Sequence, residues 1–277
     1  MNKKVRPMDI FLSIITYGSA IIVITVLFFL IGYIVIKGLP NLKLSMFALR
    51  YTSENVSVVP SIVTTLYMTL LSLLIAVPLG VFTAIYLTEY AKRGSRTVEL
   101  IRMTTETLSG IPSIIYGLFG MLFFVTRLKW GFSLAAGALT LSIMILPLII
   151  RTTEEALKAV PDSYREGSFG LGAGRLRTVF RIILPSAFPG ILSGVILGIG
   201  RIMGETAALI YTAGTVAKVP NSLTDSARTL AVHMYILSSE GLHTNEAFAT
   251  ALILLLVVVV MNSLASYIVK RISRGEN

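Results

Sequence analysis

Two ionisable side chains lie within one apolar stretch of the sequence. Arg201 and Glu205 fall inside residues 186–211, which are otherwise apolar, small or hydroxylated. A charge within such a stretch is costly to bury, so it marks a functional site by default. A guanidinium presents forked donors that suit a tetrahedral oxyanion, and Glu205, four residues later on a helix, shares the face of Arg201 and can pair with it. We expect Arg201, Glu205 and the adjacent Thr206 to line an anion pathway. A structural ion pair locking two helices is the alternative.

A second apolar stretch is interrupted by the sequence Gly110-Ile111-Pro112-Ser113. Irregular backbone at membrane depth is tolerated only inside protein or beside water. This break is therefore expected to expose backbone donors to the pathway, with Ser113 beside it. A proline kink that only sets helix packing is an equal alternative.

A third group of residues combines small side chains with fixed spacing. Glu166, Gly167 and Ser168 are followed after three residues by Gly172, and after nine more by Ile182, Leu184 and Pro185. Asp162 indicates a helix start, and the glycines remove bulk and permit a sharp turn. The pattern predicts a short surface helix that fits a groove on a soluble partner. A plain loop whose basic residues only set membrane topology is the alternative.

Composition excludes a soluble protein. The 277 residues are 55% hydrophobic and 14% charged, with a mean hydropathy of +0.81, and they include no cysteine for a disulfide or thiolate metal site. His233 and His243 lack the spacing of a metal pair and are expected to be solvated. No Gly-rich nucleotide loop and no nucleophile–base set occurs, so we expect neither ATP hydrolysis nor other catalysis by this chain.

The apolar segments predict an all-α integral membrane protein with six transmembrane helices. After a tail at residues 1–9, the membrane domain covers 10–277, with a polar loop at 151–181 and spans at about 10–36, 61–88, 108–126, 131–150, 186–211 and 247–269. Gly190, Gly194 and Gly198 share one side of the fifth span and predict a close approach by another helix.

The distribution of basic residues predicts the orientation. Sixteen Lys and Arg residues fall in the two termini and the two loops on their side, whereas seven fall in the loops on the other side. Basic residues accumulate on the cytoplasmic side of membrane proteins. Both termini and the loop 151–181 are therefore expected in the cytoplasm, and the net charge of +10 is a topology signal, not a sign of nucleic-acid binding.

These stretches together resemble a known family. The spacing from Glu166 to Pro185 is similar to the EAA coupling motif of ABC importer permeases of type I architecture, with Gly167 and Ser168 in place of the two alanines. With residues 109–113, 139–153 and 201–207 added, the sequence resembles the phosphate ABC transporter permeases, and residues 204–209 and 231–235 are similar to their PstA subunits rather than PstC. Ala208 stands where a proline is frequent.

The resemblance implies a function and a set of partners. It implies a heterodimer with a PstC-like permease, a PstB-like ATPase pair that binds ATP and Mg²⁺, an external PstS-like phosphate-binding protein, and no cofactor on this chain. Glu166, Gly167, Ser168, Gly172, Leu184 and Pro185 would then couple to the ATPase. Expected alternatives are a permease for molybdate or sulfate, and a non-conducting membrane sensor or scaffold.

Overall fold

The computed structural model describes residues 7–92 and 94–274, and all regular secondary structure in these residues is helical. Five helical segments in this part of the chain are long and apolar enough to cross a membrane, and a bent pair of helices supplies a sixth crossing if it is counted as one span. The predicted all-α membrane fold is confirmed. The predicted tail at 1–9 lies mostly outside the described residues.

Most of the helices follow one another with short connections, and the longest connection, residues 211–229, joins α9 to α10. The α-helices are α1 (Pro7–Gly38), α2 (Val59–Ile85), α3 (Arg96–Ser109), α4 (Ser113–Gly120), α5 (Leu134–Lys158), α6 (Asp162–Gly170), α7 (Arg175–Thr178), α8 (Leu184–Met203), α9 (Ala207–Ile210), α10 (Leu230–Ser239) and α11 (Thr244–Arg274). Two 3₁₀ turns, η1 (Leu39–Asn41) and η2 (Leu44–Phe47), follow α1, and three π-helical turns are η3 (Tyr86–Tyr90), η4 (Met121–Arg127) and η5 (Val179–Ile183).

Helix α5 lies at the centre of the fold. Three of the large, fully buried side chains of the main core belong to it: Leu141, Met144 and Ile145. Small residues let α2 approach it closely, because Ser72 and Ser142 donate hydrogen bonds to Ala138 O and Ser72 O, both at 3.2 Å. An apolar helix packed on several sides needs such close contacts, since lipid provides no hydrophobic drive for association.

The predicted glycine stripe on α8 also faces α5. A Cβ at Gly190 would lie 2.7 Å from Ala156 Cβ, one at Gly194 would lie 2.7 Å from Thr152 Cβ, and one at Gly198 would lie 3.5 Å from Ile149 Cδ1. The expected close approach is confirmed, and its partner helix is α5.

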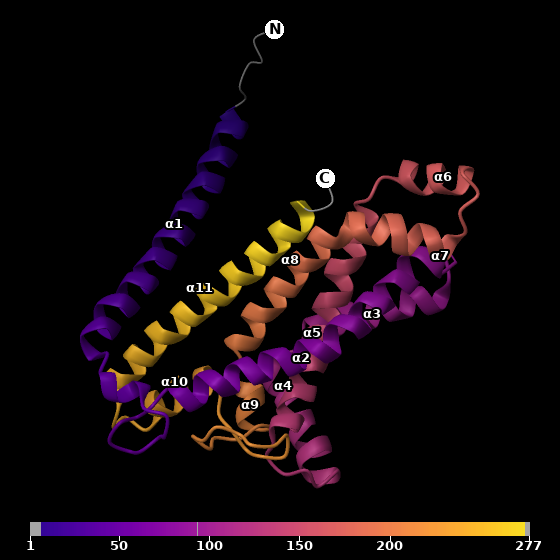
Figure 1. Ribbon diagram of the computed structural model, residues 1–277. Coiled ribbons are helices and arrows are strands. Elements are labelled where there is room, and N and C mark those ends of the chain that lie inside the picture. The colour runs from indigo at the N-terminus through magenta and orange to yellow at the C-terminus, as the bar shows by residue number, and fades with distance from the viewer. Residues whose placement is uncertain (1–6, 93, 275–277) are drawn as a thin grey trace.

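Helix α1 stands apart from this bundle. It packs on α11 near its end, where a Cβ at Gly38 would lie 2.7 Å from Phe248 O, and it diverges from α11 toward its start (Figure 1). Its apolar side chains are exposed along most of its length. Exposed apolar surface on this scale is suited to lipid or to another membrane subunit.

The third crossing is bent far more sharply than a kinked helix start. Helices α3 and α4 meet at an angle of 100°, and the break lies at residues 110–112. Residues 108 and 109, predicted to begin the third span, therefore belong to the preceding helix α3. Tyr116 Oη donates a 2.7 Å hydrogen bond to Leu108 O across the bend, in addition to the bond that this carbonyl accepts from Ile111 N at 3.1 Å.

Two other helix bounds differ from the predicted spans. Helix α5 continues through Lys158 instead of ending at residue 150, because ion pairs four residues apart, Arg151–Glu155 and Glu154–Lys158, favour helix in this polar segment. Helix α8 ends at Met203 instead of residue 211, and Gly204 to Thr206 separate it from α9.

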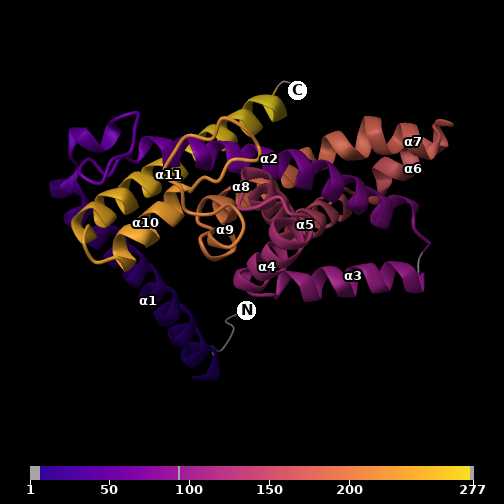
Figure 2. The same ribbon diagram turned by 90° about the horizontal axis from the view of Figure 1, so that it is seen from below.

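The molecule has two distinct ends. The start of α1, the end of α11 and the helix α6 all lie toward one side, which we name the α6 face (Figure 1). Helices α9 and α10 lie toward the other side. Figure 2, which views the molecule from that side, shows α9 beside α4, in agreement with their contact at Gly117, where a Cβ would lie 2.7 Å from Ala208 Cα.

The glycine stripe generates the first prediction. Gly194→Leu should lower the free energy of unfolding by about 1–3 kcal/mol, the usual cost of overpacking, because its side chain would displace Thr152 and separate α8 from α5. Gly200→Leu is the matched control on the same helix, since a Cβ there meets nothing within 4 Å. Thermal unfolding of the detergent-solubilised variants measures the difference. Equal stability of the two variants would contradict the packing.

Candidate functional site

Arg201 lies in the last turn of α8 and is half-buried. Its side chain lines a cavity of about 260 Å³ between α3, α5 and α8, which we name the Arg201 cavity. Within residues 7–92 and 94–274, Arg201 forms no hydrogen bond or ion pair. A guanidinium carries five donors, and here none of them is used by the chain.

The carboxylates that line the same cavity are largely occupied by other cations. Glu154 pairs with Arg102 at 2.5 Å and with Lys158 at 2.7 Å, and Glu155 pairs with Arg151 at 3.1 Å. Glu106 also lines the cavity, and it forms no ion pair within the described ranges. The Arg201 cavity therefore combines four cations with three carboxylates, and the charge of Arg201 is not neutralised by a direct partner.

The expected pairing of Arg201 with Glu205 is wrong. The helix ends at Met203, with Gly204 as its C-cap, so the two residues do not share a continuous helical face. Glu205 Oε1 instead accepts a hydrogen bond of 3.1 Å from Ala208 N, a donor at the start of α9. Backbone N–H groups in the first turn of a helix have no partner within the helix, so this carboxylate is used to satisfy one.

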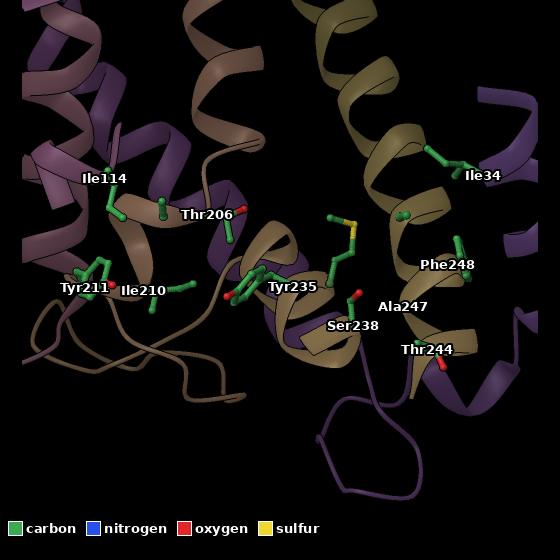
Figure 3. Close-up of a pocket in the computed structure, with 13 residues that line it drawn as sticks. Ile34, Ile114, Thr206, Ile210, Tyr211, Tyr235, Ser238, Thr244, Ala247 and Phe248 are labelled. Carbon is green, nitrogen blue, oxygen red and sulfur yellow. The ribbon is translucent and has the colours of Figure 1, made fainter. Parts of the chain in front are cut away.

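Thr206 lines a different cavity. This Thr206 cavity has a volume of about 650 Å³ and lies between α1, α4, α9, α10 and α11 (Figure 3). Its wall is mainly apolar, with Ile114, Ile210 and Phe248, and its polar groups are chiefly hydroxyls such as those of Tyr235 and Ser238. The six residues from Arg201 to Thr206 thus connect two cavities of opposite character.

Ser113 is the first residue of α4, directly after the break. It is half-buried, and among the described residues it lines neither the Arg201 cavity nor the Thr206 cavity, whereas its neighbour Ile114 lines the latter. Its place in the pathway stays a prediction.

The predicted coupling residues divide into an exposed and an anchored set. Glu166 and Gly167 on α6 are exposed, and a Cβ at Gly167 would meet nothing within 4 Å. Ser168 is buried, with its Oγ 2.8 Å from Thr178 Oγ1 on α7. The short surface helix is confirmed, and one face of it is free for a partner.

The remaining residues of this motif shape the connection to α8. Gly172 has a φ of +82°, a left-handed conformation that favours glycine, and it ends the turn after α6. Leu184 and Pro185 are the first residues of α8 and are half-buried, so they do not belong to the exposed face. The π-helical turn η5 joins α7 to α8 without interruption.

Several functional residues were not predicted. The cavity residues Arg102, Glu154 and Lys158 occur in segments expected to be loops, although the four-residue spacing of Glu154 and Lys158 is a detectable helical signal. Arg165, beside Glu166, forms an ion pair with Glu89 at 2.7 Å, and 76 residues separate the two in sequence. The hydrogen bond to Glu89 raises the pKa of Arg165 above its ordinary value, so this guanidinium stays charged.

The expectation that His233 is solvated is also wrong. His233 is fully buried, with its ring edge-on to Tyr51 at a centroid distance of 5.9 Å. Arg228 also contacts Tyr51: its guanidinium carbon lies 4.6 Å from the centroid of the Tyr51 ring. A cation over an aromatic face is attracted by the ring quadrupole, so these residues hold the segment after η2 against α10.

Comparison with known proteins places this geometry in a family. Residues 76–274 match the family described as "Binding-protein-dependent transport system inner membrane component". This chain belongs to that family. The matched residues include α5, α6, α8 and therefore the Arg201 cavity and the exposed face of α6.

Individual relatives agree with this assignment. The chain is 33% identical to "Probable ABC transporter permease protein YqgI" of Bacillus subtilis, over 97% of this chain and 96% of that protein. It is 38% identical to "Phosphate transport system permease protein PstA 2" of Mycobacterium bovis, over 75% of this chain and 68% of that protein. A solved bacterial alginate ABC transporter shares the fold, with a TM-score of 0.65 at 18% identity over 96% of this chain and 97% of that chain.

The hydrogen bond of Glu205 generates the second prediction. Glu205→Gln should keep the stability of the protein, because an amide oxygen can still accept from Ala208 N, whereas Glu205→Ala should lose about 1 kcal/mol. Thermal unfolding in detergent compares the two variants. If Glu205→Gln lowers the thermal stability as much as Glu205→Ala does, the stability depends on the negative charge of Glu205 and not on its oxygen as a hydrogen-bond acceptor.

Proposed function

We propose that this chain is the membrane permease subunit of an ATP-driven importer of inorganic phosphate and forms half of the translocation pathway. The observation that carries the proposal is the guanidinium of Arg201, unpaired among the described residues, in a cavity between α5 and α8, two helices long and apolar enough to cross a membrane. The relative PstA 2 of Mycobacterium bovis is named as a permease of a phosphate transport system, which supports phosphate as the substrate.

Arg201 has the chemistry that such a substrate needs. Phosphate carries one to two negative charges near neutral pH, and burying an unpaired charge costs several kcal/mol. A guanidinium offers two parallel N–H donors to two oxygens of a tetrahedral anion. Because Glu154 and Glu155 are held by Arg102, Lys158 and Arg151, they do not compete for Arg201.

Molybdate and sulfate share the tetrahedral shape, so a permease for one of these oxyanions is the nearest alternative. The two differ from phosphate in lacking a proton to donate at neutral pH, and the geometry of a single arginine does not separate the three. The name of the relative favours phosphate. Competition between these anions in an uptake assay distinguishes them.

The composition of the Thr206 cavity supports the involvement of a second permease subunit in the pathway. Its wall contains hydroxyls but no cationic side chain, so it offers little to a multiply charged anion. A PstC-like partner would supply the other half of the pathway. The exposed apolar surface of α1 is available to such a subunit.

The remaining partners follow from the two faces. We place the α6 face in the cytoplasm, because the termini and the loop that contains α6 hold most of the Lys and Arg residues. The exposed Glu166 and Gly167 would dock in a groove of a PstB-like ATPase pair that binds ATP and Mg²⁺. A PstS-like phosphate-binding protein would deliver substrate to the opposite face.

Arg201 generates the third prediction. Arg201→Gln should abolish phosphate uptake while the complex still assembles, and Arg201→Lys should be impaired because a point charge replaces the fork. Radiolabelled phosphate uptake and membrane abundance are measured in the same cells. Lys218→Gln, which removes a positive charge from an exposed loop, is the control.

The outcome separates the pathway from its alternatives. Normal uptake by Arg201→Gln would leave this arginine without a role in conduction and would favour the sensor or scaffold function. Loss of membrane abundance in Arg201→Gln but not in Arg201→Lys would indicate a structural role instead.

The exposed face of α6 generates the fourth prediction. Gly167→Trp should fold normally, because a Cβ at Gly167 meets nothing within 4 Å, and only a docked partner would be obstructed. Phosphate uptake should fall about tenfold, which corresponds to roughly 1.4 kcal/mol of lost docking free energy. Co-purification of the ATPase with the permease is measured alongside uptake.

Leu74→Trp is the control for this prediction. The Leu74 side chain is 67% exposed on α2, away from both α6 and the surface of α1. Wild-type uptake and ATPase recovery by Gly167→Trp would show that the ATPase does not dock on this face. A bulky residue at Gly172 is less informative, because its φ of +82° makes any side chain there a strain on the fold.

A further inference from the structure

Arg165 on α6 connects this helix to two others. Its Nη2 lies 2.7 Å from Glu89 Oε1, and its Nε lies 3.3 Å from the same oxygen and 3.4 Å from Oε2. Glu89 belongs to η3, the π-helical turn that ends α2. The side chains of Arg165 and Glu89 are only 16% and 9% exposed, so water screens this pair much less than it screens a surface ion pair.

The same guanidinium also binds the end of α5. Its Nη2 donates to Leu157 O at 3.0 Å, and its Nη1 donates to Val160 O at 2.9 Å. Leu157 lies in the last turn of α5, and Val160 lies just past its end at Lys158. A basic side chain can bond the last carbonyls of a helix in addition to their backbone partners. Arg165 therefore joins η3, α5 and α6 through one rigid fork. We name this arrangement the Arg165 clamp.

Helix α6 has a second attachment at its other end. Ser168 Oγ lies 2.8 Å from Thr178 Oγ1, which ties α6 to α7 and, through η5, to α8. This is a single bond between neutral hydroxyls, whereas the clamp is charge-assisted and uses several donors. Charge-assisted hydrogen bonds are about twice as strong as neutral ones. The charge-assisted attachment of α6 is thus to η3 and the end of α5, and it adds to the packing of α6 against α7 and η5.

The helices held by the clamp form the wall of the Arg201 cavity. Helix α5 contributes Glu154 and Lys158 to that cavity, and Leu87 from η3 lines it as well. Helices α2 and α5 are themselves joined by the bonds of Ser72 and Ser142 and by the close contact of Gly80 with Ile149. A displacement of α6 that moves the clamp would therefore move this wall.

We propose that Arg165 is a positioning residue for coupling: through Glu89 and the end of α5, it transmits the displacement of α6 to α2 and α5. The inference rests on the proposed docking of α6 with an ATPase. The motif from Glu166 to Pro185 runs along the chain from α6 through α7 and η5 to α8. The Arg165 clamp adds a second path, from α6 to α2 and α5.

The test uses the complete transporter in proteoliposomes, with ATP hydrolysis and phosphate uptake measured on the same preparation. Arg165→Gln and Glu89→Gln should each keep ATP hydrolysis near the wild-type rate. The phosphate transported per ATP should fall about tenfold, the size of a typical coupling between sites. Lys43→Gln is the control, because it removes an ion pair of similar length, 2.9 Å to Glu246, remote from α6.

A second variant separates transmission from folding. The chain has no cysteine, so Glu89→Cys with Arg165→Cys introduces the only two thiols of this subunit. Before cross-linking, this variant should be uncoupled; a short bifunctional thiol reagent that joins the two residues should restore transport per ATP. Both states are measured on one folded preparation.

The results distinguish this inference from the docking that it rests on. If the clamp variants lose ATPase recovery or hydrolysis together with uptake, Arg165 only places α6 for docking, and the transmission role is overturned. Unchanged transport per ATP in Arg165→Gln or in the unlinked cysteine pair would overturn it too. So would failure of the cross-link to restore coupling. Failure of docking itself is seen separately, as wild-type behaviour of Gly167→Trp.

Discussion

The close approach of α5 to its neighbours is the constraint on which the rest of the structure depends. The glycines on α8, and Gly80 on α2, have no side chains, so their backbones come into contact with Ile149, Thr152 and Ala156 of α5. In a membrane, van der Waals contact and hydrogen bonds supply most of the free energy that holds helices together. Because α5 packs against α2 on one side and α8 on the other, the position of its polar last two turns is fixed. Glu154 and Lys158 of these turns form one wall of the Arg201 cavity.

The electrostatics of that cavity follow from how the carboxylates are distributed. Glu154 has two cationic partners, from α3 and from its own helix, and Glu155 has one. The end of α8 contributes Arg201 without a carboxylate of its own, because Glu205 is turned toward the first backbone donors of α9. A cation that keeps its donors free can hold an anion weakly and release it, whereas an arginine already paired with glutamate would first have to break that pair.

Features that depend on composition or on the spacing of residues could be predicted from the sequence. Features that depend on contacts between residues far apart in the sequence could not. The length of the apolar segments was enough to predict the membrane helices, and the spacing of Gly190, Gly194 and Gly198 was enough to predict their close contact. The partnership of Arg201 with Glu205 failed because a four-residue spacing has meaning only on an unbroken helix, and Gly204 ends it. The pairing of Arg165 with Glu89 spans 76 residues, and neither local propensity nor charge pattern could reveal it.

The two interruptions of the helices are physically related. The break at 110–112 is followed by α4, the break at 204–206 is followed by α9, and these two short helices meet where Gly117 lies against Ala208. The first break is closed by the hydrogen bond from Tyr116 to Leu108 O, and the second by the bond from Ala208 N to Glu205. Tyr116 and Ala208 thus each form a hydrogen bond across a break and also lie where α4 packs against α9. Irregular backbone at membrane depth is stable only where protein or water satisfies it. Here local hydrogen bonds satisfy both breaks, so the chain can change direction between the charged Arg201 cavity and the apolar Thr206 cavity without leaving those backbone groups unpaired.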